Sequence, residues 1–367
     1  MKCLALLATA ALAGSAAAQP AAVPPPAPPL SPPPAAELRQ CGICHGRPEF
    51  KQVDADGTVR TLWVDEGQLA ASVHAKWHCI DCHADVGRIP HPARLAPVNC
   101  QRCHFPGNPV GAPEEVNYEG YVKSVHGRLR QAGNPKAPAC QDCHGGHGVR
   151  KPGDPASAVH PVKVPQTCGR CHVQVFAEYT TSAHGISLLE KGNTEAPSCS
   201  SCHGEHGILP AKENASSVSA THIPETCSNC HGMTEFNLRY GIPINPVRTF
   251  RHTFHGIANE LGSARVANCA SCHTAHHVLA ASDPRSTVNP ANIPATCGKE
   301  GCHPGANANY ARGRFHIDPS SRDAGIVFWV ALFFKILTAS TLAALGAHIL
   351  LDLAKKLRHR HGATARD

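Results

Sequence analysis

One pattern recurs along this chain: two cysteines followed directly by a histidine. Eight copies have two residues between the cysteines, and the ninth, which ends at His303, has four. The cysteines are Cys41, Cys44, Cys79, Cys82, Cys100, Cys103, Cys140, Cys143, Cys168, Cys171, Cys199, Cys202, Cys227, Cys230, Cys269, Cys272, Cys297 and Cys302. The histidines are His45, His83, His104, His144, His172, His203, His231, His273 and His303. Cys-x-x-Cys-His is the sequence that attaches c-type haem.

In such a site, the two thiols bind the porphyrin covalently and the adjacent histidine ligates the iron. Zinc sites also use paired cysteines, but they do not need a histidine after each pair. A disulfide scaffold needs no histidine at all. Only Cys3 of the 19 cysteines lies outside the nine pairs. The sequence therefore predicts nine covalently bound haem c groups.

The composition limits the core that the polypeptide itself can build. Only 5% of the residues are aromatic, and the chain has 31 glycines and 32 prolines. Nine haems would supply most of the buried surface. The predicted fold class is therefore mainly irregular, with short α-helices around covalently bound haems, as in a multihaem cytochrome c, and with little or no sheet. We assign residues 37–319 to this nonahaem domain.

Both ends of the chain carry apolar segments. Residues 1–18 resemble a secretory signal peptide, with Lys2, an apolar run and small residues at the expected cleavage site. Residues 19–36 are nearly all alanine and proline and predict an extended linker. Residues 324–353 are long and apolar enough for one transmembrane helix, and residues 354–367 form a basic tail.

The positive tail predicts a cytoplasmic C-terminus. The haem domain would then lie in the periplasm of a bacterium, anchored to the inner membrane by a single span. The formal charge of +7 does not indicate a nucleic-acid partner, because each haem would add two propionates.

An internal repeat orders the remaining histidines. Three copies contain a His-Gly, then 14 or 15 residues later an attachment motif, then a second histidine and a further motif. The second histidine precedes the next cysteine by 21 residues in all three copies. Cys297 therefore occupies the position of a haem cysteine despite its longer spacer. A looser copy begins at His74.

The repeat predicts a second iron ligand for each haem. The candidates are His74, His91, His126, His147, His184, His206, His255, His276 and His316. Two histidines per iron and almost no methionine predict low reduction potentials. His78 could exchange roles with His74. His160, His222, His252 and His277 have no counterparts in the other copies and are expected to be structural.

His147 is too close to His144 in sequence to bind the same iron from the opposite side. It should reach a neighbouring haem, which would tie the haems into a closely spaced chain. Because electron tunnelling falls steeply with distance, this pattern predicts a path for electrons.

Two ionisable residues lie inside the apolar C-terminal segment, where they are costly and hence functional candidates. His348 could ligate a haem b shared with a partner membrane subunit, or it could extend to the interface or pack against another helix. Lys335 could meet a haem propionate or a quinone headgroup, or pair with a partner helix.

The sequence Ala-Pro-x-Cys-x-x-Cys-His-Gly-x-His, at residues 137–147 and 196–206, resembles multihaem cytochromes of the cytochrome c3-like superfamily. With the helix that follows residues 315–319, the chain is similar to the periplasmic part of inner-membrane c/b fusion cytochromes of metal-reducing bacteria. That resemblance covers about residues 38–353. It implies quinol oxidation by an attached dihaem cytochrome b, whose further helices do not follow here, so a separate partner would have to provide them.

Together these features predict an electron carrier with no catalytic residue. It would relay electrons between a membrane subunit of the cytochrome b or quinol-oxidising type and periplasmic redox proteins or extracellular acceptors. The alternative is a multihaem reductase that acts on a nitrogen or sulfur oxyanion, which would need an iron with an open position.

Overall fold

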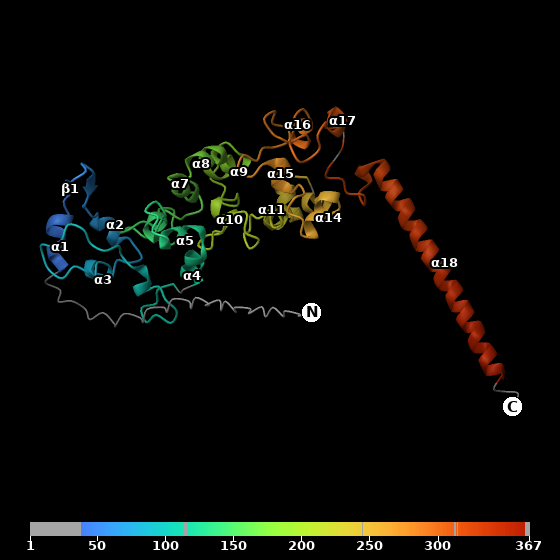
Figure 1. Ribbon diagram of the computed structural model, residues 1–367, viewed down its shortest axis with the longest axis horizontal. Coiled ribbons are helices and arrows are strands. Elements are labelled where there is room, and N and C mark those ends of the chain that lie inside the picture. The colour runs from blue at the N-terminus through green and yellow to red at the C-terminus, as the bar shows by residue number, and fades with distance from the viewer. Residues whose placement is uncertain (1–37, 114–115, 244, 312, 314, 364–367) are drawn as a thin grey trace, which may run out of the picture. The chain divides into compact units, whose positions relative to one another are not determined.

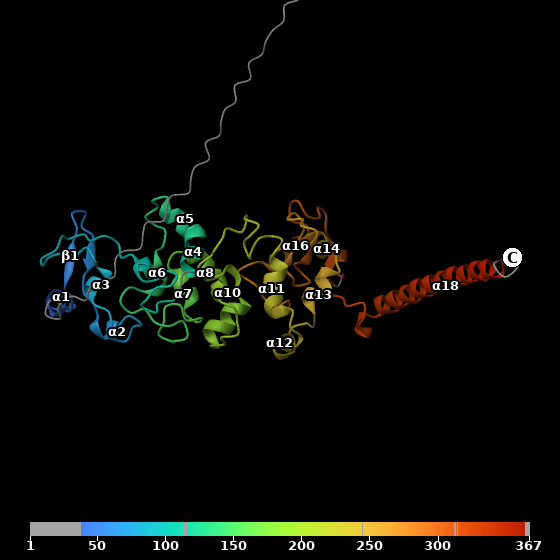
Figure 2. The same ribbon diagram turned by 90° about the horizontal axis from the view of Figure 1, so that it is seen from below.

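The structure is a computed structural model that describes residues 38–113, 116–243, 245–311, 313 and 315–363. The predicted signal peptide and linker, and the last four residues of the basic tail, lie outside this part of the chain. Figures 1 and 2 show short helices joined by irregular segments, with one long helix, α18, near the C-terminal end. The chain is divided into two compact units.

The first unit comprises residues up to Trp63 and Trp77–Glu114. Its elements are α1 (Leu38–His45), β1 (Lys51–Val53), β2 (Val59–Thr61), α3 (Cys79–Cys82) and the 3-10 turn η1 (Cys100–Arg102). The strands β1 and β2 form a small antiparallel hairpin in which Gln52 pairs with Arg60. This hairpin is the only sheet in the described residues, in keeping with the low strand content that the sequence predicts.

The second unit comprises Val64–Lys76 and the residues from Glu115 onward. Its first half contains α2 (Glu66–Ala70), α4 (Val116–Lys123), α5 (Val125–Gln131), α6 (Cys140–His144), α7 (Val164–Gly169), α8 (Val173–Thr180), α9 (Ala183–Gly185), the π-helical turn η2 (Ile186–Glu190) and α10 (Cys199–His203). Its second half contains α11 (Ile223–His231), α12 (Thr234–Arg239), α13 (Pro246–Arg251), α14 (Phe254–Glu260), α15 (Cys269–His273), α16 (Ile293–Cys297), α17 (Ala308–Ala311), the 3-10 turn η3 (Arg322–Ala324) and α18 (Ile326–Ala363).

The polypeptide buries few apolar side chains. Those buried in the described residues are Ala137, Ala139, Tyr179, Leu188, Ala196, Val247 and Leu279. Small polar residues are buried more often, among them Ser124, Ser182 and Thr249. An ordinary domain of this length depends on a large apolar core. The scarcity of such residues agrees with the composition, which also predicts that the chain cannot form an extensive core by itself.

The helix α18 is the one described element long and apolar enough to cross a membrane. Its candidate span is Ile326–Arg358, and none of the apolar window is buried within the protein. A bilayer needs about 20 apolar residues in a helix. The predicted single transmembrane helix is therefore compatible with the structure, although α18 continues past residue 353 into the predicted tail. Overall, the described chain is helical and irregular, as expected from the sequence.

Candidate cofactor-binding sites

Each of the nine attachment motifs begins on, or forms, a short helical turn. In α6, α10 and α15, the turn is the motif itself, from the first cysteine to the histidine. One helical turn places residues i and i+3 on the same face. Both thiols of a pair therefore lie on one side of the turn, and the histidine follows at its end.

The ninth pair occupies the same place as its shorter equivalents. Thr296 donates a hydrogen bond to the carbonyl of Thr287, nine residues upstream, at 2.7 Å. Thr167 and Thr226 make the same bond, also to residues nine positions upstream, at 2.7 and 2.6 Å. The two extra residues form a turn that returns the chain, since His303 N–H still bonds to the carbonyl of Cys297 at 3.0 Å.

Seven ring contacts pair a motif histidine with a histidine of the repeated set. The pairs are His45–His91, His126–His172, His144–His206, His184–His231, His203–His276, His255–His303 and His273–His316. Fourteen of the eighteen predicted histidine ligands are thus placed ring against ring, in the combinations that two-histidine coordination requires. For His74, His83, His104 and His147, pairing stays a prediction.

The pairs fall into two geometric classes. Where the partner is the histidine that follows the first motif of a repeat, the rings are near parallel: the interplanar angles are 7° for His45–His91, 4° for His144–His206 and 15° for His203–His276. Where the partner belongs to the His-Gly that opens a repeat, the rings are tilted by 42° to 55°. The three pairs of this kind are His126–His172, His184–His231 and His255–His303. The last pair, His273–His316, has an intermediate angle of 34°.

The separation of the rings leaves room for a metal ion between them. Ring centroids are 5.7 to 6.3 Å apart in the seven pairs. A first-row metal lies about 2 Å from an imidazole nitrogen, so two axial imidazoles place their centroids about 6 Å apart. Direct aromatic contact covers about 4.5–7 Å, so distance alone does not decide between the two explanations. The pairs recur in combinations of one motif histidine with one repeated histidine, and the ion itself stays a prediction.

Burial favours the neutral form of several of these imidazoles. It lowers the pKa of His184 to about 4, with a smaller contribution from His231. Burial also lowers the pKa of His126, His203 and His273. Only the neutral imidazole has a lone pair for a metal. In His45, Nδ1 lies 2.6 Å from the carbonyl of Leu62, which can accept the proton of Nδ1 and leave Nε2 available as a ligand.

A hydroxyl residue two positions before each repeated His-Gly shapes its turn. Ser182 donates to the carbonyl of Tyr179 at 2.7 Å and accepts from Gly185 N–H at 3.0 Å. Ser124 and Thr253 make equivalent bonds around Gly127 and Gly256. These turns were not predicted from the sequence, although a Ser or Thr recurs two residues before the histidine and could have indicated them. These bonds fix the histidine at the start of a helix.

The glycine after each of these histidines is required by a close backbone approach. A Cβ on Gly185 would lie 1.9 Å from the carbonyl oxygen of Tyr179. We expect Gly185→Ala to force α9 away from α8, displace His184 from His231 and destabilise the protein by about 1–3 kcal/mol. Chemical unfolding measured by circular dichroism tests this. Gly146→Ala is the control, because a Cβ there has open space; equal losses in both variants would contradict the explanation.

Neighbouring attachment pairs are close in space. Cys168 and Cys199, from consecutive motifs, share a thiol hydrogen bond that lowers the pKa of Cys168 to about 7 and raises that of Cys199. Cys227 and Cys269 share a thiol hydrogen bond of the same kind, which raises the pKa of Cys227 and lowers that of Cys269. Within the first unit, burial and a hydrogen bond with Cys41 raise the pKa of Cys79. Within each unit, consecutive motifs therefore meet in the order of the sequence, which the sequence alone did not establish.

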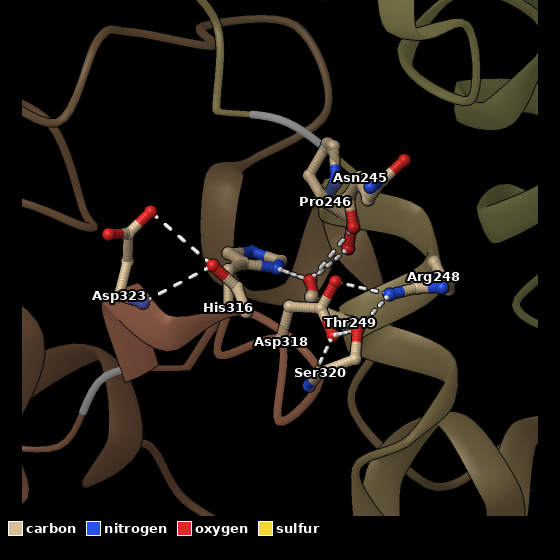
Figure 3. Close-up of polar contacts among 9 residues, drawn as sticks. Asn245, Pro246, Arg248, Thr249, His316, Asp318, Ser320 and Asp323 are labelled. Carbon is tan, nitrogen blue, oxygen red and sulfur yellow. Dashed lines mark hydrogen bonds and ion pairs between the residues drawn. The ribbon is translucent and has the colours of Figure 1, made fainter. Parts of the chain in front are cut away.

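The His316 site differs from the repeats, because no further repeat follows to supply its histidine. Figure 3 shows His316 beside Thr249, with Asp318 turned toward Arg248. Thr249 Oγ1 lies 3.0 Å from His316 Nδ1 and donates to the carbonyl of Asn245 or Pro246 at 3.0 or 2.9 Å. Arg248 forms an ion pair with Asp318. These contacts hold the segment that precedes α18 against α13.

His222, His160 and His78 contact residues that are near them in sequence. His222 Nδ1 contacts Ser219 at 3.1 Å and the carbonyl of Ser216 at 3.1 Å. His160 Nδ1 accepts from Val162 N–H at 3.4 Å. Both contacts agree with the structural interpretation. His78 lies 3.4 Å from Asp81, and whether it replaces His74 stays open. Lys335 and His348 are exposed on α18, and their roles stay predictions.

The described residues contain no cluster of three or more His, Cys, Asp or Glu side chains that could hold a metal ion. A haem iron needs only two ligands from the protein, because the porphyrin supplies the other four, so a pair of histidines suits it. Comparisons with protein-family models, with curated proteins and with solved structures found no match for this chain.

Proposed function

We propose that this chain is a membrane-anchored multihaem cytochrome c that carries electrons in the bacterial periplasm. Paired cysteines would tether nine haems, the histidine after each pair would be the first axial ligand, and the repeated histidine the second. Haem iron supplies a one-electron couple whose potential depends on its ligands and surroundings. The polypeptide would fix these ligands, keep them neutral and hold neighbouring sites together.

The observation that carries this proposal is the set of seven histidine pairs. Each pair combines residues that the sequence had assigned separately, one by the attachment motif and one by the repeat. A zinc or disulfide interpretation gives no reason for a motif histidine to face a histidine 43 to 73 residues away in sequence. Two histidines at the distance of two axial ligands are what six-coordinate haem requires.

The pairing also favours electron transfer over catalysis. A reductase of nitrogen or sulfur oxyanions needs an iron position open to substrate. In the seven pairs, a second imidazole faces the motif histidine at the distance of an axial ligand. Rapid binding of cyanide or nitric oxide to one haem of the intact protein would support the reductase instead.

The membrane helix suggests where electrons enter or leave. The α18 span would anchor the periplasmic domain in the inner membrane, with the basic residues after it in the cytoplasm. A membrane subunit of the cytochrome b or quinol-oxidising type would be the partner on that side, with His348 as a candidate ligand for a shared haem b. Periplasmic redox proteins would be the partners on the other.

The attachment of haem is tested by the mass of the intact chain. When the protein is made in a host with c-type haem maturation enzymes, we expect the denatured chain to be heavier than the polypeptide by nine haems. The variant Cys297→Ser/Cys302→Ser should lose one haem and keep eight. A chain that carries no covalent haem would overturn the proposal.

The direction of exchange with the membrane is tested by quinol reduction of the detergent-solubilised chain, followed at the haem absorption band. Reduction only together with co-purified membrane subunits would support the proposed relay. Fast reduction of the isolated chain would instead place a quinol site on this polypeptide, with Lys335 and His348 as its first candidate residues.

A further inference from the structure

One position recurs beside the second-ligand histidines, four residues before each Ser or Thr that caps a histidine turn. The position is occupied by Gln68, Gly120, Glu178 and Thr249, ahead of Ser72, Ser124, Ser182 and Thr253. The first three lie against the histidine-bearing segment of the next repeat, and Thr249 lies against the segment of His316, which follows the last attachment motif. We call it the facing position. Its four side chains are an amide, a hydrogen atom, a carboxylate and a hydroxyl.

The contacts show that the facing position meets the same part of the next segment each time. Thr249 Oγ1 lies 3.0 Å from His316 Nδ1. Glu178 Oε2 lies 3.8 Å from His276 Nδ1. A Cβ built on Gly120 would lie 3.5 Å from Cβ of His206, and the side-chain oxygen of Gln68 lies against Gly148, the residue after His147.

A backbone hydrogen bond fixes this arrangement from one repeat to the next. Val125 N–H donates to the carbonyl of Ile208, two residues after His206, at 2.8 Å. Ala183 N–H makes the same bond to Val278, two residues after His276, and Val73 N–H to Val149, two residues after His147, both at 2.8 Å. In these three repeats, the backbone bond thus holds the facing position beside its histidine-bearing segment. Thr249 is held beside His316 by its own hydrogen bond and by the ion pair of Arg248 with Asp318.

The side chains of Thr249 and Glu178 act on the Nδ1 atom of the histidine that each of them faces. The Thr249 hydroxyl donates its only proton to a carbonyl of the Asn245–Pro246 segment, so its oxygen accepts the proton of His316 Nδ1. This leaves Nε2 to bind a metal. A carboxylate at the same place adds a negative charge near the iron. Glu178 acts in this way, because its Oε2 lies 3.8 Å from His276 Nδ1, within the range of an ion pair but beyond that of a hydrogen bond.

We propose that the facing position sets the reduction potential of individual haems in this chain, with Glu178 and Thr249 as positioning residues for the ligands His276 and His316. The inference rests on the proposed function. A more basic imidazole and a nearby negative charge both stabilise the oxidised iron. Glu178 therefore lowers the potential of the haem attached at Cys199 and Cys202, whose motif histidine, His203, faces His276 at 6.1 Å.

The test is a potentiometric titration of Glu178→Gln, followed at the haem absorption band and by electron paramagnetic resonance of the oxidised protein. We expect the potential of one haem to rise and the others to stay unchanged. The shifted haem should have the resonance of near-parallel axial rings, because the His203–His276 angle is 15°. Circular dichroism of the oxidised protein should not change.

Glu119→Gln is the matched control. Glu119 lies next to the facing position of the preceding repeat and has the same charge as Glu178, but its side chain is exposed and pairs with Lys123 at 3.1 Å. The control should leave all potentials unchanged. The proposal is overturned if Glu178→Gln shifts no haem, if it lowers the potential, or if it acts as Glu119→Gln does.

A second pair of variants tests the hydroxyl. Thr249→Val removes the hydroxyl acceptor beside His316 Nδ1 at nearly constant volume, whereas Thr249→Ser keeps that hydroxyl. Thr249→Val should raise the potential of one haem, and Thr249→Ser should restore the original value. Equal effects of both variants would contradict a role for the hydroxyl.

The failure of this inference can be distinguished from that of the proposed function. If the purified chain contained no haem, the proposed function would fail. If it contained nine haems whose potentials did not depend on residues 178 and 249, only this inference would fail.

Discussion

Without covalently bound haem, the chain is expected to remain largely unfolded. Ordering the backbone costs about 1–2 kcal/mol per residue, which burial of apolar surface must offset. In the described residues, only seven apolar side chains are buried, and three of them are alanines. The apolar cluster found in this part of the chain comprises Tyr179, Leu188 and Ala196, with Val162 and Leu189 packed against it. The polypeptide alone cannot reach the stability of an ordinary domain of this length.

This expectation can be measured on the haem-free chain, made in a reducing cytosol without residues 1–18 and without the C-terminal helix. Far-ultraviolet circular dichroism should show little helix, and heating should give no cooperative transition. The control is the same residue range exported and matured with haem, which should show both. A cooperative transition in the haem-free chain would mean that its short helices pack without the cofactor.

Replacement of a single repeated histidine is expected to open one iron and leave the rest intact. His276 and His277 are adjacent, yet only His276 lies ring to ring with a motif histidine, His203. In His276→Ala, about one haem in nine should become high-spin and bind carbon monoxide or cyanide, because its second axial ligand is lost. Visible absorption and carbon monoxide titration of the reduced protein measure this fraction.

His277→Ala is the control and should bind no more carbon monoxide than the original protein. Both variants remove one imidazole from the same loop, so a general loosening of the loop would affect them alike. Equal carbon monoxide binding in the two variants would show that the pairing of His203 with His276 does not reflect ligation.

Much of the candidate site could be predicted from the sequence, because covalent attachment of haem needs a fixed local motif. The repeat then separated His126, His184 and His255 from histidines such as His160, which have no counterparts. In the structure, His126, His184 and His255 each face a motif histidine, as two-histidine coordination requires. The presence of haem itself stays a proposal.

The partner of each histidine could not be predicted, because pairing depends on how the repeats pack. His206 follows His203 by three residues but faces His144, in the preceding repeat. The sequence excluded His206 as a second ligand at the motif of His203, but it did not identify the motif histidine that His206 faces. The bonds that fix this choice, such as Val125 N–H to the carbonyl of Ile208, are made by the backbone and leave no pattern in residue identity. The same holds for the carbonyl of Leu62 beside His45.

The two kinds of histidine pair have a consequence for the timing of assembly. A chain that crosses a membrane from its N-terminus presents His126, His184 and His255 before the motifs with which they pair, so both ligands of those sites are present when the motif emerges. His144, His203 and His273 emerge before their partners His206, His276 and His316. In the proposed cytochrome, each of these sites would wait with an incomplete ligand set until the next stretch of chain arrives. The last of them would be completed only by the segment that leads into α18, so export of the proposed haem domain and completion of this site would coincide.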